Sequence, residues 1–158
     1  GGRGVAGKGG RFFWFGQFDY ETCFITVRYF QPYGLDHAEF DQSPCPELIA
    51  ANGLARSLAG MSHPYRQLSW GNANRCCVFS GEKGSLAALW NWKSKGRIAI
   101  PVGGTKYALA NFFGEPIGVS PDEKGEIVVE LEGAPKYLSL PEQDGEACCR
   151  LLQGARPE

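Results

Sequence analysis

The sequence has few of the residues that metal and nucleophile sites need. Its 158 residues include only two histidines, and the six cysteines form no Cys-x-x-Cys pair. Structural zinc sites need Cys and His ligands at characteristic spacing, so neither zinc nor another cofactor is expected. The Gly-x-Ser-x-Gly signature of serine hydrolases is also missing. The sequence therefore gives no indication of metal-dependent or serine-based catalysis.

Charge and long apolar runs are equally sparse. The formal net charge is −1, which provides no electrostatic attraction to nucleic acid or to an anionic membrane surface. No apolar run approaches the roughly 20 residues that span a bilayer. We therefore expect neither a nucleic-acid partner nor a membrane partner. The cysteines are compatible with disulfides, but free buried thiols are favoured, and cysteine usage leaves the redox compartment open.

Short apolar runs separated by turn residues dominate the second half of the chain. In residues 126–131, for example, Ile127, Val129 and Leu131 alternate with other residues. Period-two alternation places one set of side chains on a buried face and the other on a wet face. Such short strands predict an antiparallel β-sandwich over residues 65–152, followed by a tail at 153–158. The strands that we expect are residues 67–70, 75–79, 86–92, 97–102, 107–113, 126–131, 137–140 and 147–152, with a hairpin turn at 71–74.

The first 60 residues have a different character. Residues 1–10 form a flexible, glycine-rich lead, and residues 46–59 predict a helix because Pro46 suits its first position and Gly60 its end. The segment Phe12–Phe18 predicts a strand that is apolar on both faces, which is normally covered on both sides. Residues 19–45 read as loop with a short apolar piece from Phe24 to Phe30. The aromatic strand therefore either joins the sandwich or requires cover from protein outside this chain.

This order of elements resembles the C-terminal end of glycoside hydrolases of the (β/α)8 clan. The similarity extends over about residues 11–140, although Asn111 stands where the family usually has Asp, and Cys45 where a basic residue is common. The motifs that carry the resemblance are Tyr33-Gly34-Leu35, Ser43-Pro44-Cys45-Pro46-Glu47, Leu86-Ala87-Ala88-Leu89-Trp90, Asn111-Phe112-Phe113-Gly114-Glu115-Pro116 and Gly133-Ala134-Pro135-Lys136-Tyr137-Leu138.

The resemblance implies that residues 11–60 are the last strand, loop and helix of a barrel, fused to the β-sandwich. It implies a role in completing the barrel and supporting carbohydrate binding or glycosidic bond hydrolysis. The family's catalytic carboxylates follow the fourth and seventh barrel strands, so no residue of this chain is assigned as catalytic. Phe12–Phe18 would contact the rest of a barrel or another chain, and an extracellular or periplasmic location is slightly favoured.

Three residues are candidates for substrate binding. Trp14 matches a position where the clan often has an aromatic residue that stacks on the sugar. Asp19 and Glu21 are two residues apart just after the aromatic strand, which could place both at one rim. Glycosidases need two carboxyl groups that flank the bond, but solvated loop acids remain the favoured interpretation of this pair.

Two tryptophans on a later strand suggest a different function. Trp90 and Trp92 share a face if the strand is regular, as on the platform of a non-catalytic carbohydrate-binding module. Alternatively, that face is the sandwich interior or the surface that covers the barrel, and Trp70 and Tyr137 have the same ambiguity. A structural interaction domain without a ligand is the third interpretation.

Overall fold

The computed structural model describes residues 10–18, 25–31 and 46–158, and it describes side chains from Asn52 onward, His63 excepted. The chain is mostly β and its strand pairs are antiparallel, as the sequence predicted. Its elements are β1 (Gly10–Phe18), β2 (Ile25–Gln31), α1 (Pro46–Leu58), β3 (Met61–Trp70), β4 (Asn74–Gly81), β5 (Gly84–Asn91), β6 (Gly96–Pro101), β7 (Ala108–Ala110), β8 (Pro116–Ile117), β9 (Glu126–Leu131), β10 (Lys136–Leu140), α2 (Gly145–Gln153) and β11 (Arg156–Pro157).

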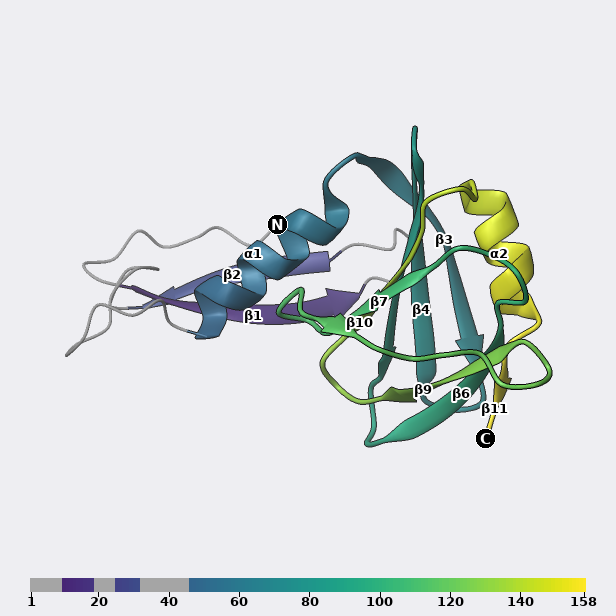
Figure 1. Cartoon of the computed structure of the whole chain (residues 1–158). Helices are drawn as coiled ribbons and strands as arrows, with labels where there is room; N and C mark the ends of the chain where they lie inside the picture. The colour runs from purple at the N-terminus through teal and green to yellow at the C-terminus, as the bar shows by residue number, and fades with distance from the viewer. Residues whose placement is uncertain (1–9, 19–24, 32–45) are drawn as a thin grey trace.

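Two sheets are consistent with the predicted β-sandwich. The larger has six strands in the order β3-β4-β5-β10-β7-β8, and the smaller has three in the order β11-β6-β9. Figure 1 shows the small sheet and α2 on one side of the large sheet, with α1 and the β1–β2 hairpin extending away from the other. The edge strand β3 contains Pro64, and its register shifts on either side of that residue. An edge strand tolerates proline because no second ladder needs its missing N–H.

The main core lies between the two sheets and α2. It is built from alternate residues of β4, β5, β6, β9 and β10. The predicted alternation of a buried and a wet face is confirmed for β9, but the wet face is wrong for β4, β5 and β10, whose other face is also buried. Helix α2 closes the core through Cys148, Cys149 and Leu152, and the Trp70 indole N–H donates a hydrogen bond to the Leu152 carbonyl at 3.1 Å. The helix and the long strand β3 are therefore joined by a buried polar contact as well as by packing.

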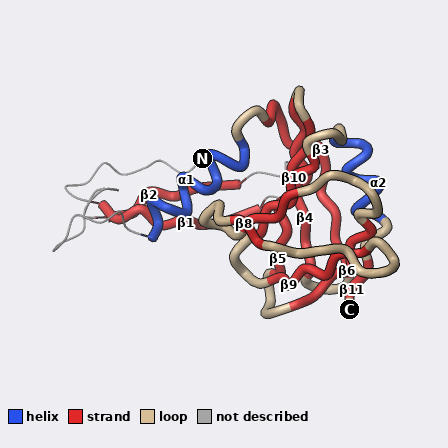
Figure 2. Tube along the Cα trace, viewed as in Figure 1, coloured by secondary structure: helices blue, strands red, loops and turns tan. Residues whose placement is uncertain are grey.

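The opposite face of the six-stranded sheet is also apolar. Its buried side chains are Leu54, Cys77, Phe79, Leu86, Ala88, Trp90 and Tyr137, and we call this set the outer cluster. Leu54 comes from α1, so the helix supplies part of the cover for this face. The adjacent residues Cys76 and Cys77 fall in the main core and the outer cluster respectively, as expected for neighbours on a strand. Figure 2 shows α1 running beside the strand-rich part of the molecule.

The aromatic strand β1 has a partner within the chain. It pairs antiparallel with β2, so the prediction that residues 19–45 are loop is wrong for Ile25–Gln31. Helix α1 lies against β1. Among the described residues, β1 pairs with no strand of either sandwich sheet. The hairpin is therefore a separate two-stranded sheet. The antiparallel pairing differs from the parallel pairing of barrel strands, which the resemblance implies for β1.

Two other predictions of secondary structure need correction. Residues 147–152, predicted as a strand, lie in α2, because Asp144 accepts a hydrogen bond from the Ala147 N–H at 2.8 Å and begins a helix. The buried positions Cys148, Cys149 and Leu152 also follow helical spacing. The predicted strand at 107–113 is limited to β7, because the residues that follow form a tight turn organised by Asn111.

Candidate functional site

The three residues proposed from the sequence for substrate binding cannot be assembled into a site. Trp14 lies in β1, where the structure describes the backbone but not the side chain. Asp19 and Glu21 lie outside the described residues. Their role stays a prediction.

Most of the remaining aromatic candidates are structural. Trp70 is 8% exposed in the main core, and Trp90 is 7% exposed in the outer cluster. Tyr137 is 1% exposed, and its hydroxyl has no hydrogen-bond partner among the described residues. Burial raises the pKa of Tyr137, so its hydroxyl stays protonated. These rings anchor the six-stranded sheet on its two faces and are not available to a ligand.

Trp92 differs from the other described tryptophans because it is 55% exposed. It follows the last residue of β5, so it leaves the strand alternation that buries Trp90, and the predicted Trp90–Trp92 platform is wrong. Its backbone N–H donates to the Ala73 carbonyl at 3.2 Å, and its indole N–H donates to the Asn72 carbonyl at 3.2 Å. The Lys93 ammonium lies 5.0 Å from the ring centroid. The ring is thus held at the surface in a defined position.

The support beneath Trp92 is a buried pair of amides. The Asn91 side-chain amide donates to the Asn74 side-chain oxygen at 2.8 Å, and both residues are buried. The Asn91 side-chain oxygen accepts hydrogen bonds from the backbone N–H groups of Lys93 and Ser94. Gly96 lies so close that a Cβ there would clash with the amides of this pair. The turn after Trp92 is therefore fixed by several polar contacts.

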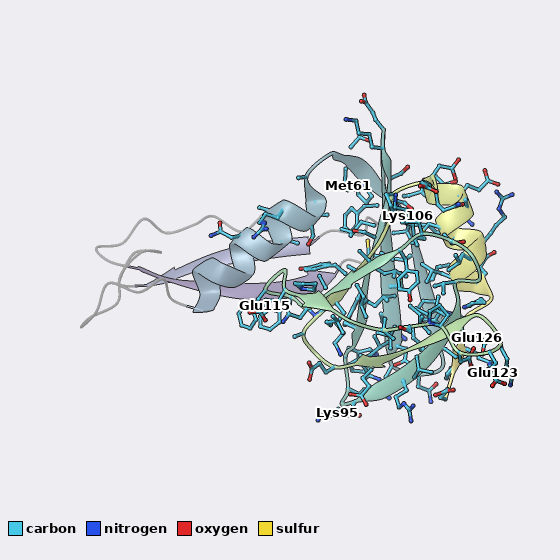
Figure 3. The ribbon with its side chains drawn as sticks, in the orientation of Figure 1. Met61, Lys95, Lys106, Glu115, Glu123 and Glu126 are labelled. Atoms are coloured by element: carbon cyan, nitrogen blue, oxygen red, sulfur yellow. The ribbon has the colours of Figure 1, made fainter. Side chains whose placement is uncertain are left out.

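A second feature joins the sandwich to α1. A Cβ added to Gly53 in α1 would lie 2.7 Å from the Gly114 nitrogen and would clash with the Phe113 carbonyl group. Gly114 has a φ of +85°, which favours glycine. Figure 3 shows Glu115, the next residue, in the loop beside α1, and Met61 between the helix and the large sheet. Glycine at both positions allows the helix backbone to contact the turn directly.

Asn111 organises that turn. Its side-chain oxygen accepts hydrogen bonds from the Phe113 N–H at 3.0 Å and from the Glu115 N–H at 2.9 Å. Its side-chain amide donates to the Glu115 carboxylate at 2.7 Å. The turn thus pairs an amide with a carboxylate.

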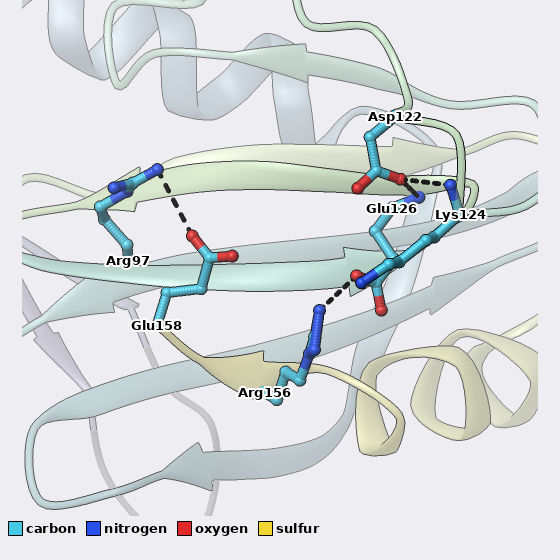
Figure 4. Close-up of polar contacts among 6 residues, drawn as sticks. All are labelled: Arg97, Asp122, Lys124, Glu126, Arg156 and Glu158. Atoms are coloured by element: carbon cyan, nitrogen blue, oxygen red, sulfur yellow. Dashed lines mark hydrogen bonds and ion pairs between the residues drawn. The ribbon is translucent and has the colours of Figure 1, made fainter.

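The C-terminus is attached to the small sheet by charged side chains. Arg97 pairs with Glu158 at 3.4 Å, and Arg156 of β11 pairs with Glu126 of β9 (Figure 4). In the same view, Asp122 accepts hydrogen bonds from the N–H groups of Lys124 and Glu126. The bond from Glu126 is the largest cause that holds the pKa of Asp122 below its ordinary value. These contacts hold the ends of the small sheet together.

Two surface cavities have the volume of small-molecule sites, but neither brings together described side chains that would form a catalytic or metal-binding group. One, of about 400 Å³, lies between the end of α1 and the β4–β5 hairpin. The other, of about 440 Å³, is lined by both acidic and basic side chains near Glu158. Among the described residues, no group of three or more His, Cys, Asp or Glu residues could hold a metal ion. In the same part of the chain, no helix is long and apolar enough to cross a membrane.

Comparisons with protein-family models, with curated proteins and with solved structures gave no match to this chain. Sequence reasoning identified Trp92 but not its support, because Asn72 is 20 residues away in the chain. It also missed the contact between Gly53 and Gly114. A glycine in the middle of a helix was the available signal, since glycine costs about 1 kcal/mol there relative to alanine.

Proposed function

We propose that this chain is the C-terminal part of a glycoside hydrolase-like protein, in which the β-sandwich supports a barrel-like unit that binds and hydrolyses carbohydrate. The observation that carries the proposal is the apolar character of both faces of the six-stranded sheet. One face packs on the small sheet and α2, and the other carries the outer cluster. A sheet in a free-standing sandwich normally leaves its outward face polar. This sheet instead faces a second layer that begins with α1.

The Gly53–Gly114 contact supports the same role. The backbones of α1 and the 111–115 turn approach each other so closely that no side chain fits between them at Gly53. In the proposed protein, α1 is the last barrel helix, and the sandwich holds it in place. The strand β1, against which α1 lies, would then be fixed indirectly.

Catalysis in the proposed protein belongs to carboxylates of other barrel strands, as the resemblance implies. Trp14, Asp19 and Glu21 would contribute at most to substrate binding at the rim of the barrel. The antiparallel β1–β2 hairpin adds a requirement to this proposal. In a closed barrel the last strand pairs in parallel with both the preceding and the first strand, so β2 would have to leave the edge of β1 that it occupies here.

The deciding experiment extends the chain toward its N-terminus with whatever its gene encodes there. We expect alternating strand and helix segments before residue 11, with a carboxylate after the fourth strand and another after the seventh. The extended protein should hydrolyse an aryl glycoside, and changing either carboxylate to its amide should abolish turnover without unfolding. Robust hydrolysis by these 158 residues alone would contradict the proposal, and so would a preceding sequence without strand–helix repeats.

A further inference from the structure

We infer that Trp92 is a glycan-stacking site on the sandwich. Its ligand would be a pyranose unit of an oligosaccharide, with the C–H face of the sugar on the indole ring. The inference rests on the carbohydrate class of the proposed function, but it concerns residues of this chain alone. The site consists of Trp92, the Asn72 amide and the Lys93 ammonium.

Trp92 differs from an ordinary exposed hydrophobic residue in how it is held. Single apolar side chains on a surface are common and need no explanation. Here, however, the indole N–H is bonded to the Asn72 carbonyl, and the backbone N–H is bonded to the Ala73 carbonyl. The buried Asn74–Asn91 amide pair fixes the segment from which the ring projects. A ring that is already ordered loses little conformational entropy when a ligand binds.

The groups around the ring suit a polyhydroxylated ligand. The Asn72 side chain is exposed, and its amide has no hydrogen-bond partner in the part of the chain that the structure describes. It can both donate to and accept from sugar hydroxyls. The Lys93 ammonium lies over one face of the ring, 5.0 Å from its centroid, so a sugar would stack on the opposite face. An exposed indole ring with an amide and an ammonium group on nearby residues therefore suits a pyranose, which has an apolar face and a polar edge.

A single-stranded nucleic acid could also stack a base on an indole. Such binding normally requires a basic groove along the strand, and the chain has a formal net charge of −1. The observations therefore favour a sugar, and a nucleic acid becomes one outcome of the test.

The test labels the full chain with 5-fluorotryptophan and titrates it with cellohexaose, xylohexaose and maltohexaose while recording fluorine NMR spectra. Loss of one resonance in Trp92→Phe assigns the signal. We expect saturable binding of at least one sugar at up to millimolar concentration, with the largest shift at Trp92. Trp92→Ala should weaken binding by at least about tenfold, which corresponds to about 1.4 kcal/mol. Asn72→Ala should weaken it by a smaller factor.

The matched control is Tyr65→Ala, since Tyr65 is the other large hydrophobic residue exposed in the described part of the chain. It should leave binding unchanged. Saturable binding of none of the three sugars would overturn the inference, as would undiminished binding by Trp92→Ala or tighter binding of oligothymidylate at the Trp92 resonance. Because this titration measures binding by the chain alone, its failure is distinct from a failure of the extended protein to hydrolyse glycosides.

Discussion

Gly53 in α1 lies directly against Gly114 in the turn that follows β7, and neither position has room for a Cβ without displacement of backbone atoms. Alanine would normally stabilise a helix by about 1 kcal/mol relative to glycine. At Gly53, the clash with the Phe113 carbonyl group opposes this gain. The sign of the change in stability therefore reports whether α1 is docked on the sandwich.

We predict that Gly53→Ala lowers the free energy of unfolding by about 1–3 kcal/mol, the usual cost of overpacking. Urea denaturation followed by tryptophan fluorescence measures the change. Asn52→Ala is the matched control, because Asn52 is exposed in the same helix and its substitution should be neutral or slightly stabilising. A Gly53→Ala protein about 1 kcal/mol more stable than the wild type would show that the helix does not contact the turn.

The Asn111–Glu115 hydrogen bond predicts that the stability of the protein depends on the charge at position 111. Asn111→Asp would place a carboxylate 2.7 Å from the Glu115 carboxylate, which now accepts a hydrogen bond from the amide. We expect a loss of about 1 kcal/mol at low ionic strength, because the pair is at the surface, and a smaller loss in high salt. Adding Glu115→Gln should restore most of the stability. A double-mutant cycle measures the coupling, and additive effects of the two changes would contradict the proposed contact.

Removal of the side-chain cap at the N-terminus of α2 is predicted to lower stability and to change the tryptophan fluorescence. Asp144→Ala removes the acceptor for the Ala147 N–H and should cost about 1 kcal/mol, the typical value of a helix cap. Since the Trp70 indole is bonded to the Leu152 carbonyl at the other end of α2, loosening of the helix should shift the tryptophan emission to longer wavelength. Glu146→Ala removes an exposed ion pair with Arg150 and a carboxylate from the first turn, and it should change both quantities less than Asp144→Ala does. Equal effects of the two variants would argue against the cap.

The lowered pKa of Asp122 predicts that the free energy of unfolding decreases at acidic pH. Backbone N–H groups hold the pKa of its carboxylate below the ordinary value of 3.8, so the folded chain favours the charged form. The contribution to stability is therefore present above pH 3.8 and is lost as the pH falls through the lowered pKa. Asp122→Asn should flatten the curve of unfolding free energy against pH in this range. The same slope in both proteins would contradict the assignment.

The buried cysteines predict resistance to alkylation. Cys76, Cys77, Cys148 and Cys149 are buried, and burial raises the pKa of Cys148 to about 12. The stability that the protonated Cys148 thiol contributes is present below its ordinary pKa of 9 and is lost as the pH rises toward 12. We expect iodoacetamide to modify these four positions only after the chain is unfolded, as measured by mass spectrometry of peptides. Rapid modification of Cys148 in native conditions would contradict its burial.

Sequence patterns predicted the strand β9 because burial on one side leaves a period of two, as in Ile127, Val129 and Leu131, but they did not predict that β4 and β5 are buried on both faces. They failed where a single side chain decided the local structure. Asp144 begins a helix in residues with a strand-like composition, and Asn111 ends β7 after three residues. Trp92 could not be separated from Trp90, because the end of β5 depends on contacts with residues about 20 positions earlier.

The outer cluster also bears on whether recombination could separate α1 from the sandwich. Phe79, Leu86 and Trp90 each contribute about 1.5–3 kcal/mol when removed from water. A gene that encoded the sandwich without α1 would remove Leu54 from this cluster and expose part of it to water. Recombination that separated the two halves would therefore be disfavoured. We expect related proteins that contain the sandwich also to contain the helix α1.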